Sequence, residues 1–547
     1  MRVCSTHAAS LLLCAFFVGL PGGARGQQVE VPPRVRAAAD RITAEQLGRD
    51  LAYLSSDALL GRNTPSPGFD SAAAYIARRL ARAGLKPLGD DGTFFQHYDL
   101  RDETVETATA YLDVARRRFR FGDDFIMRTF AGALYGNFPV VYVGHGWTVP
   151  GQHIDPYADV DVRGKILLVH GFTAPRNVEV QQIGRITANA SPAIVEAQRR
   201  GAAGIMYIAP PSALESWDQA RRMNLTRLEL DPIVPSAYAA PALTSVVLRP
   251  QVTEALLAGE RIAGAELTAR GEADDYPASF QLGKTITLNV PVATEGLHRP
   301  YNVVAMLEGG DPALRNEYIT IASHLDGAVG RTALNGDSIY NAADDNATGS
   351  AATLAMAEQM MNAPRPKRSI IFIWDSGEER GLWGTRRFVH RPPVLLEAIV
   401  AHFNIDMIGA NRAPGSPDAA SAETTGPNEV YLVGPGVLSA RVDTLLVRVN
   451  RGYLNLRYNR AFDLGNHPFF YPRTDAGPFL ERGVLTIGYF TGLHDRYHRP
   501  SDEARYMDTG KMESIARTIF ASAWMLADSA ERPRIDKEIP PSVPRHR

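Results

Sequence analysis

Residues 318–326 read Tyr-Ile-Thr-Ile-Ala-Ser-His-Leu-Asp, an apolar run that ends in a histidine and a carboxylate. A second apolar run at 369–374 leads to two adjacent glutamates, and a third at 399–405 ends at Asp406. Continuous Ile, Val, Phe and Leu runs of this length are typical of strands covered on both faces of a sheet. The sequence therefore predicts strands that each deliver chemically active side chains at their carboxyl end.

Helical and strand-like segments alternate around these runs. Further strands are expected at 301–307, 429–433 and 484–490, and helices at 42–56, 69–83 and 348–361. Such alternation predicts an α/β fold with a doubly wound, mostly parallel sheet. In a sheet of this kind, the side chains that bind ligands collect at the carboxyl ends of the strands.

The pattern changes between residues 106 and 281, where short β-type runs surround one helix at 194–200. We expect this stretch to form a smaller inserted domain of mixed α and β structure. The main domain is then discontinuous, built from 40–105 and 282–530. The remaining segment, 531–547, is rich in proline and charge and is expected to be a flexible tail.

Composition excludes some function classes and predicts a location. The formal net charge of −2 over 547 residues gives no strong field that would recruit nucleic acid. Residues 1–26 combine an apolar run with small residues before a cleavage site, which predicts a signal peptide and a secreted or periplasmic protein. No later run reaches about 18 apolar residues, so we expect no stable membrane span.

Cysteine chemistry is not expected in the mature chain. Cys4 and Cys14 are the two cysteines, and both lie in the predicted signal peptide. Lipid attachment at Cys14 is disfavoured because the bulky Leu13 precedes it. Any metal must then be held by His, Asp and Glu.

A set of such residues gathers at the expected strand ends. The candidate metal-binding side chains there are His324, Asp326, Asp344, Asp345, Glu378, Glu379, Asp406, His494 and His498. Two metal ions about 3.5–4 Å apart, with a carboxylate bridging them, would use such a set. Mixed imidazole and carboxylate ligands suit two Zn²⁺ ions, with Co²⁺ or Mn²⁺ as substitutes.

The motifs around these residues resemble those of the M28 family of zinc metallopeptidases. The matching pieces are Ser-His324-Leu-Asp326-Gly, Asn-Ala-Ala-Asp344-Asp345-Asn-Ala-Thr-Gly, Gly-Glu378-Glu379-Arg-Gly-Leu-Trp-Gly-Thr, Asn-Ile-Asp406-Met-Ile-Gly and Tyr497-His498-Arg-Pro-Ser-Asp502. Their spacing also matches, with 20 residues from His324 to Asp344, 35 from Asp344 to Glu379 and 27 from Glu379 to Asp406. The stretch from Tyr157 to Ile166, followed by Gly-Ala-Ala-Gly at 201–204, is similar to the protease-associated (PA) domain, an insert common in that family.

The resemblance implies the zinc exopeptidase fold and a role for each motif residue. His324 and Asp406 would bind one zinc, Glu379 and His498 the other, and Asp344 would bridge the two. Glu378 would be the general base, and Ser376-Gly377 is expected to form a turn that aims both glutamates at the site. Asp326 would orient His324 by accepting its second ring N–H, and Tyr497 would hydrogen-bond the oxyanion.

Other polar residues near the motifs receive structural roles. Asp345 is expected to cap the following helix, His494 to line the pocket from a loop, and His402 and Asn404 to form a packed polar pair. The departures from the family pattern at Arg499 and at Asp475-Ala476-Gly477 leave the substrate preference open.

The resemblance implies a secreted two-zinc aminopeptidase acting on peptides with a free N-terminus. A carboxypeptidase or dipeptidase of the same fold is the first alternative. It would require a basic residue that reads the substrate carboxylate, and the sequence does not place Arg331, Arg386 or Arg473 relative to the site. A glutaminyl cyclase and a non-catalytic binding protein are further alternatives. The sequence does not determine the oligomeric state.

Overall fold

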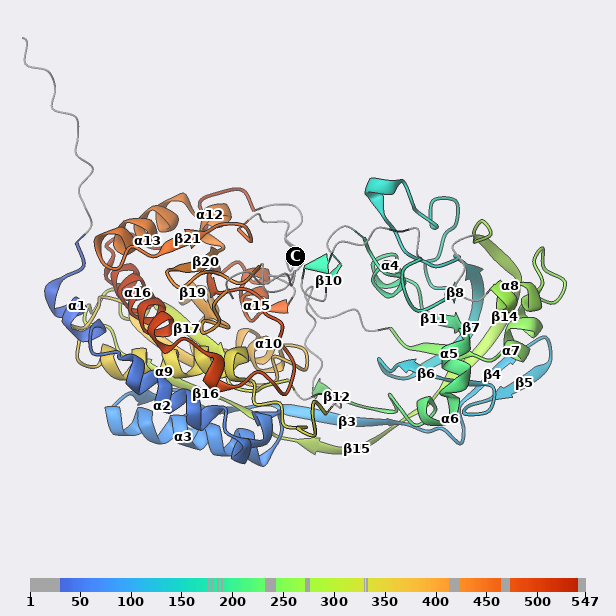
Figure 1. Cartoon of the computed structure of the whole chain (residues 1–547), viewed down its shortest axis with the longest axis horizontal. Coiled ribbons are helices and arrows are strands. Elements are labelled where there is room, and N and C mark those ends of the chain that lie inside the picture. Colours follow the sequence, from blue (N-terminus) through green and yellow to red (C-terminus); the bar gives the residue numbers. More distant parts are fainter. Residues whose placement is uncertain are drawn as a thin grey trace, which may run out of the picture.

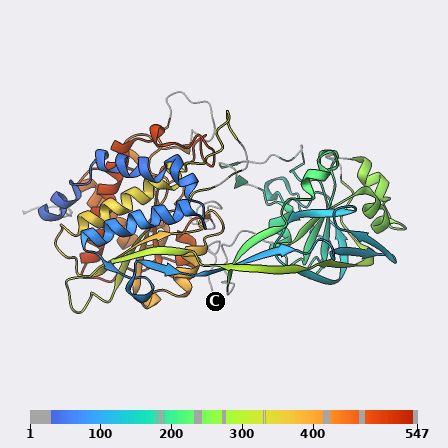
Figure 2. The same cartoon turned by 90° about the horizontal axis from the view of Figure 1, so that it is seen from below.

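The computed structural model describes residues 30–539 except 176–177, 179–181, 184–185, 188–189, 232–242, 271–275, 329, 331–332, 413–422 and 464–472. The whole predicted signal peptide and the last part of the predicted tail, 540–547, thus lie outside the described residues. The chain forms two lobes joined by a long ribbon of strands (Figures 1 and 2). Among the helices that the structure describes, none is both long and apolar enough to cross a membrane.

The larger lobe is built on a nine-stranded sheet in the order β1-β16-β18-β17-β19-β22-β20-β21, with β2 paired to β16. Its strands are β1 (Lys86–Pro87), β2 (Phe95–His97), β16 (Tyr301–Leu307), β17 (Tyr318–His324), β18 (Ser369–Asp375), β19 (Ile399–Ile405), β20 (Glu429–Val433), β21 (Arg457–Asn459) and β22 (Leu485–Phe490). The four central strands β18, β17, β19 and β22 are parallel, whereas β16 runs antiparallel to β18 and β20 runs antiparallel to β22. The α/β class and the parallel centre of the sheet are confirmed, and the flanks add antiparallel pairs.

Alternate residues of the central strands enter different cores, because successive side chains of a strand point to opposite faces. Phe372 and Trp374 pack into the larger core, whereas Ile371 and Ile373 pack into a smaller one on the other face. The larger core is covered by helices α1 (Pro33–Ala39), α2 (Ala44–Leu54), α3 (Pro67–Ala83), α9 (Gly349–Met360), α12 (Pro435–Leu438), α13 (Ala440–Gly452) and α16 (Thr509–Asp528). The smaller core is covered by α10 (Trp383–His390) and α15 (Ala476–Glu481), so the sheet is doubly wound as predicted.

Helix α3 illustrates why these segments fold as they do. The side chain of Ser66 accepts a hydrogen bond from the backbone N–H of Phe69 and caps the first turn. Gly84 ends the helix with φ 83°, a left-handed conformation that suits glycine. Between these ends, Phe69, Ile76 and Leu80 are at most 1% exposed. Burying each such side chain contributes about 1.5–3 kcal/mol.

The smaller lobe has an eight-stranded sheet in the order β5-β4-β14-β7-β8-β11-β13-β6. Its elements are β4 (Tyr111–Val114), β5 (Arg117–Arg120), β6 (Phe125–Thr129), β7 (Leu134–Tyr142), β8 (Ile166–His170), β11 (Gly204–Ile208), β13 (Ser245–Leu248), β14 (Phe280–Val290), α4 (Ala193–Arg199), α5 (Pro211–Glu215), α6 (Trp217–Ala220), α7 (Pro250–Leu257) and α8 (Gly264–Arg270), with a separate strand pair β9 (Gln182–Ile183) and β10 (Ile186–Thr187). It has its own two hydrophobic cores. The mixed α/β character of the inserted segment agrees with the expectation, while its likeness to a PA domain stays a prediction.

Two boundaries differ from the expected ones. β14 belongs to the smaller lobe, where it pairs with β4 and β7, so that lobe extends beyond residue 281. At the other end of the chain, residues 532–539 do not fray. Asp536 accepts hydrogen bonds from the Ser439 hydroxyl and the Ala440 backbone N–H, and Ile535 packs against the larger core.

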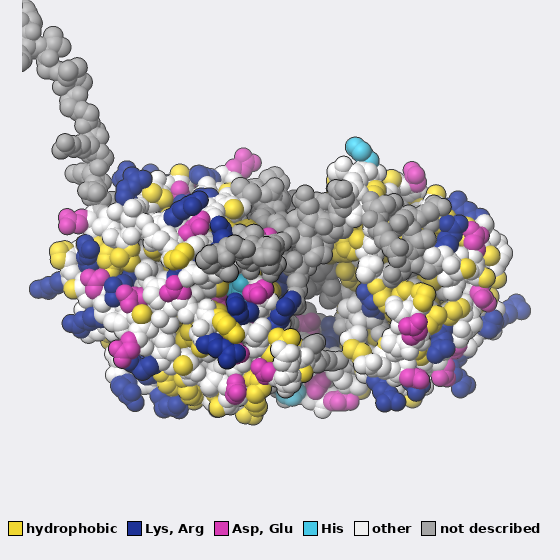
Figure 3. All heavy atoms as spheres, viewed as in Figure 1, with side chains coloured by type: hydrophobic (Ala, Val, Ile, Leu, Met, Phe, Trp, Pro, Cys, Tyr) yellow, Lys and Arg dark blue, Asp and Glu magenta, His cyan; other side chains and the backbone are white. Residues whose placement is uncertain are grey.

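The two lobes are joined by a three-stranded antiparallel ribbon. β3 (Asp99–Val105) carries the chain into the smaller lobe, β15 (Val292–His298) carries it back, and β12 (Thr226–Asp231) reaches out from the smaller lobe beside β3. Figure 1 shows these strands running along one side of the molecule from lobe to lobe. Figure 3 shows side chains of both charge signs interspersed on the surfaces of both lobes in this view.

Candidate metal centre

The predicted ligands come from strand ends that lie side by side. β17 pairs in parallel with both β18 and β19, so the three carboxyl ends meet at one edge of the sheet. β17 ends at His324, and Asp406 follows β19 directly. Glu379 lies on the turn after β18, and His498 lies on the loop after β22.

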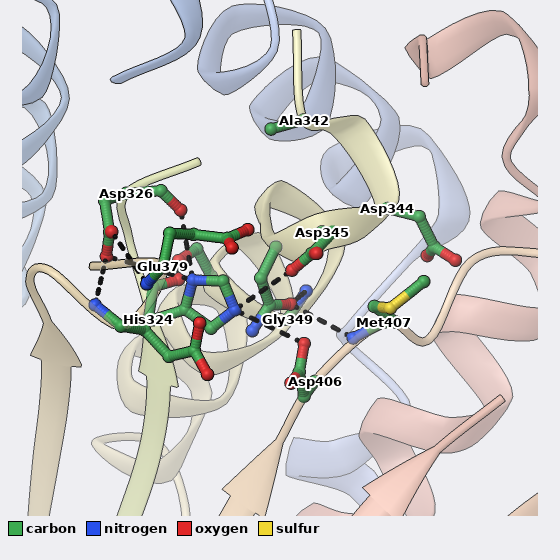
Figure 4. A network of polar contacts seen from close by, with 12 residues as sticks. His324, Asp326, Ala342, Asp344, Asp345, Gly349, Glu379, Asp406 and Met407 are labelled. Atoms are coloured by element: carbon green, nitrogen blue, oxygen red, sulfur yellow. Dashed lines mark hydrogen bonds and ion pairs between the residues drawn. The ribbon is translucent and has the colours of Figure 1, made fainter. Parts of the chain in front are cut away.

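Two groups of possible ligand atoms share one aspartate, and Figure 4 shows the first of them, His324, Asp345 and Asp406. In the first, His324 Nε2 lies 3.1 Å from Asp345 Oδ1 and 3.4 Å from Asp406 Oδ1. In the second, His498 Nε2 lies 3.0 Å from Asp345 Oδ2 and 3.0 Å from Glu379 Oε2. Within each group the ligand atoms lie within 4.8 Å of one another. Asp345 offers one carboxylate oxygen to each group, which is the arrangement of a bridging ligand.

The bridging position was expected for Asp344, and the geometry corrects this expectation. Asp344 Oδ1 accepts hydrogen bonds from the Gly409 N–H (2.7 Å) and the Thr348 hydroxyl (3.1 Å). Its Oδ2 faces His494 Nε2 at 3.2 Å. Figure 4 shows the Asp344 side chain directed away from His324, whereas Asp345 points toward it. Asp344 thus binds Gly409 and Thr348 through Oδ1, faces His494 through Oδ2, and is not part of either group.

The turn that presents Asp345 is fixed from two sides. The carboxylate of Asp502 accepts the backbone N–H groups of Asp344 (3.0 and 3.2 Å) and Asp345 (3.2 Å). Asn346 Oδ1 accepts the N–H of Gly349 (3.0 Å), and its Nδ2 donates to the Ile405 carbonyl (2.9 Å). The prediction that Asp345 caps the helix is therefore wrong, because Asn346 binds the first N–H of α9 and leaves the Asp345 carboxylate to the site.

The ring of His324 is oriented by the backbone of Asp326 rather than by its side chain. Nδ1 of His324 lies 3.0 Å from the Asp326 carbonyl oxygen and 3.9 Å from the nearer carboxylate oxygen. Donation from Nδ1 leaves the Nε2 lone pair facing Asp345 and Asp406, as a metal-binding imidazole requires. The Asp326 carboxylate instead accepts the backbone N–H groups of Glu378 (3.2 Å) and Glu379 (3.4 Å). It therefore ties the glutamate turn to the histidine.

The expected turn between β18 and the two glutamates is present. Gly377 has φ 70°, and a Cβ there would lie 2.6 Å from Trp383 Cε3, so only glycine fits. Burial raises the pKa of Glu378 well above its usual range; among the neighbouring charges, His324 opposes this shift and Glu379 adds to it. Burial likewise raises the pKa of Glu379 to about 7, with Asp345 adding to the shift and His498 opposing it.

The donor set fits a divalent metal. His324 Nε2, Asp406 Oδ1, Glu379 Oε1 and His498 Nε2 are buried atoms without a hydrogen-bond partner, and unpaired buried polar atoms are costly. Burial lowers the pKa of His498, yet Glu379 and Asp345 outweigh it and raise the pKa to about 10. Imidazole nitrogens and carboxylate oxygens in two three-residue groups are ligands that zinc accepts.

Aromatic and basic side chains border the centre. The ring of Tyr497 stacks on that of His498, with ring centroids 3.8 Å apart. Arg473 Nη2 donates to the Tyr497 hydroxyl at 3.3 Å, so a guanidinium lies next to the site. Arg386, the second arginine considered above, lies 3.9 Å from Glu229, and Arg331 is outside the described residues. A cavity of about 10 Å³ lies between Asp345, His498 and Arg499, and such a space holds roughly one water.

Two further histidines near the centre, His494 and His402, have structural roles. His494 Nδ1 accepts a hydrogen bond from the backbone N–H of Arg496 (3.2 Å), so the proton of the ring is on Nε2, which faces Asp344. His494 thereby links the loop after β22 to the turn that carries Asp344. His402 is fully buried, with Nδ1 2.8 Å from the Thr320 hydroxyl and its ring stacked on Phe479. His402 is therefore a packed core residue, and its polar partner is Thr320 rather than Asn404.

Comparison with known proteins identifies the segment that carries this centre. Residues 302–523 match the family described as "Peptidase family M28". This segment belongs to peptidase family M28. All of the residues that form the two ligand groups lie within the M28 segment.

One curated relative matches about a third of the chain in sequence. The chain is 31% identical over 195 residues to leupeptin-inactivating enzyme 1 of Streptomyces exfoliatus, a match that covers 32% of this chain and 41% of that protein. The chain thus matches about two fifths of the length of that relative.

Two solved structures resemble the whole chain. The aminopeptidase of Aneurinibacillus sp. strain AM-1 has a TM-score of 0.49 at 16% identity, covering 94% of this chain and 100% of its own. The zinc aminopeptidase BSAP of Bacillus subtilis has a TM-score of 0.47 at 15% identity, covering 91% and 99%.

Proposed function

We propose that this protein is an exported zinc aminopeptidase that uses two metal ions to remove residues from the N-terminus of peptides. The observation that carries the proposal is the shared aspartate, since Asp345 offers one oxygen to His324 and Asp406 and the other to His498 and Glu379. The match of residues 302–523 to a peptidase family and the likeness of part of the chain to a leupeptin-inactivating enzyme support the same reaction class.

Each residue of the site has a part in this proposal. His324, Asp345 and Asp406 would hold one zinc, and Asp345, Glu379 and His498 the other. When bound, zinc supplies Lewis-acid polarisation of the scissile carbonyl and lowers the pKa of water. The Glu378 carboxylate takes a proton from the attacking water and returns it to the leaving nitrogen, and burial adapts it to this task by raising its pKa. The Tyr497 hydroxyl is placed to donate to the oxyanion.

A carboxypeptidase or dipeptidase is the second candidate, because Arg473 lies beside Tyr497 at the edge of the site. A guanidinium at that position suits a substrate carboxylate. Three peptides of one sequence separate the candidates: one with both termini free, one with a blocked N-terminus and one with an amidated C-terminus. An aminopeptidase cleaves the free and the amidated peptides and spares the blocked one. Cleavage of the blocked peptide alongside the free one would favour the carboxypeptidase.

The ligand assignment has a matched test in two neighbouring residues. Zinc content per chain after gel filtration should be about two for the wild type. Asp345→Asn should lose zinc from both sites, whereas Asp344→Asn should keep both with affinity weakened about 10-fold to 100-fold, as expected for a residue beyond the ligands. The opposite result, with zinc lost only from the Asp344 variant, would restore the original expectation and refute the bridging role of Asp345.

Export is proposed from the sequence pattern of residues 1–26. Expression with this segment in a bacterial host should yield a processed protein that begins at Gln27. An unprocessed N-terminus on protein retained in the cytoplasm would count against export without affecting the proposed activity.

A further inference from the structure

The turn that carries Glu378 and Glu379 is held by the base of the ribbon between the lobes. The Tyr98 hydroxyl, directly before β3, lies 3.1 Å from the Ser376 carbonyl oxygen and 2.8 Å from Ser376 Oγ. Ser376 Oγ donates to Asn302 Oδ1 (3.2 Å), so Tyr98 supplies the proton in its own contact with Ser376. Ser376 is thus fixed two residues before Glu378.

A small hydrophobic cluster continues this contact into the ribbon. Its buried members are Tyr98 and Leu100 from the strand that enters the smaller lobe, Leu230 from β12 and Trp383 from the start of α10. Trp383 is 3% exposed and closes the glutamate turn, because its backbone N–H donates to the Gly377 carbonyl at 3.1 Å. Trp383, at the C-terminal end of the glutamate turn, therefore packs with Leu230 of β12, a strand that belongs to the smaller lobe.

A charged contact runs parallel to the cluster. Arg386 of α10 is 7% exposed and lies 3.9 Å from Glu229, the neighbour of Leu230 on β12. Arg227 lies 3.5 Å from the same glutamate and 2.7 Å from Glu103 on β3. Strands β3 and β12 of the ribbon are thereby linked to α10, the helix that follows the glutamates.

We propose that Tyr98 is a positioning residue for Glu378, and that the ribbon of the smaller lobe is a brace for the catalytic turn. In this proposal the inserted lobe supports the site directly, because Leu230 reaches back from inside the insert and packs in one cluster with Trp383. The proposal rests on the proposed role of Glu378 as the general base. A shift of about 1 Å in such a group costs up to roughly 100-fold in rate.

The test is Tyr98→Phe, which removes the hydroxyl and keeps the ring. The matched control is Tyr157→Phe in the smaller lobe, since Tyr157 is 2% exposed and its hydroxyl donates to the Gly146 carbonyl at 2.8 Å. For Tyr98→Phe we expect kcat to fall on the order of tenfold, with KM and zinc content unchanged. For Tyr157→Phe we expect thermal stability alone to change. Leu230→Ala should reproduce the kcat loss from the other strand of the ribbon.

Amide hydrogen exchange gives a readout that does not need activity. Exchange in 376–384 of the metal-free protein should be faster in Tyr98→Phe than in the wild type or in Tyr157→Phe. Unchanged exchange there, or an unchanged kcat in an active enzyme, would overturn the brace. If the wild type proves to have no peptidase activity, the proposed function fails, and the exchange result still decides whether Tyr98 holds the turn.

Discussion

His402 should make the larger lobe sensitive to acid. Its side chain is 0% exposed, its ring stacks on Phe479 with centroids 3.8 Å apart, and Nδ1 lies 2.8 Å from the Thr320 hydroxyl. Burial lowers its pKa from 6.5 to about 3, because the imidazolium would have to lose its hydration inside the core.

The sign and the size of the effect follow from linkage. Between pH 6.5 and about 3 the unfolded chain binds a proton at this position that the folded chain does not. The stabilising contribution is therefore complete above pH 6.5 and is lost as the pH falls, at about 1.4 kcal/mol per pH unit. From pH 7 to pH 5 the free energy of unfolding should fall by about 2 kcal/mol through His402 alone.

The assay is denaturant unfolding of zinc-free protein at pH 7 and pH 5, with His402→Gln as the reference. Glutamine removes the titrating ring and can still pair with Thr320. The acidic residues of the metal centre titrate in both proteins, so their contribution cancels in the difference. We expect the wild type to lose about 2 kcal/mol more than the variant. Equal losses in both proteins would refute the buried neutral histidine.

Three other substitutions test the site and its supports. Glu378→Gln should keep its zinc and lower kcat by about 10²-fold to 10⁴-fold, and turnover near that of the wild type would refute the general base. Arg62→Met should lower the free energy of unfolding by about 3 kcal/mol or more, because the buried guanidinium donates to the carbonyls of Leu54, Leu325, Asn341 and Ala342; an unchanged denaturation midpoint would contradict this. Gly349→Ala should lower the free energy of unfolding by roughly 1–3 kcal/mol and weaken zinc binding, because a Cβ would lie 2.3 Å from Asn346 Oδ1 and 2.7 Å from the Ile405 carbonyl oxygen. If the variant binds zinc and unfolds as the wild type does, the turn accommodates the added methyl group and this expectation is wrong.

The central strands were predictable because strands buried on both faces consist of continuous runs of apolar residues. β18 and β19 lie within one residue of the expected ranges, and both faces of each are covered. The edge strands β1 and β21 have only two and three residues, and pairing with their neighbours defines them more than their own composition does. Strands of two or three residues are too short to leave a periodic signal in the sequence.

The choice between Asp344 and Asp345 shows where sequence reasoning ends. Both residues are acidic and adjacent, and the spacing to the other motifs differs by only one residue. Which carboxylate faces His324 depends on the backbone of the turn, where Ala342 has φ 51° and Asp502 holds the N–H groups of both aspartates. Asp502 lies 158 residues after Asp344, so no pattern in the sequence around the two aspartates indicates this contact.

The brace around Tyr98 was not predictable for the same reason. Tyr98, Leu230 and Trp383 come from three separate parts of the chain, and each alone is an ordinary buried residue. Only the assembled ribbon brings them to the turn that bears the glutamates.

The contacts of α2 with α16 determine when the larger lobe can be completed during synthesis. The Ala44 N–H donates to Glu513 Oε2 at 2.6 Å across 469 residues, and Arg517 Nε donates to the Ile42 carbonyl at 2.8 Å. The first helices therefore leave the ribosome long before their partners exist, and their apolar faces stay open while the smaller lobe can already close around its own cores. Contacts between such distant residues slow folding, and until they form, hydrophobic surfaces that can aggregate stay exposed. A nascent chain truncated before α16 should consequently need a holding chaperone, even though most of its residues are present.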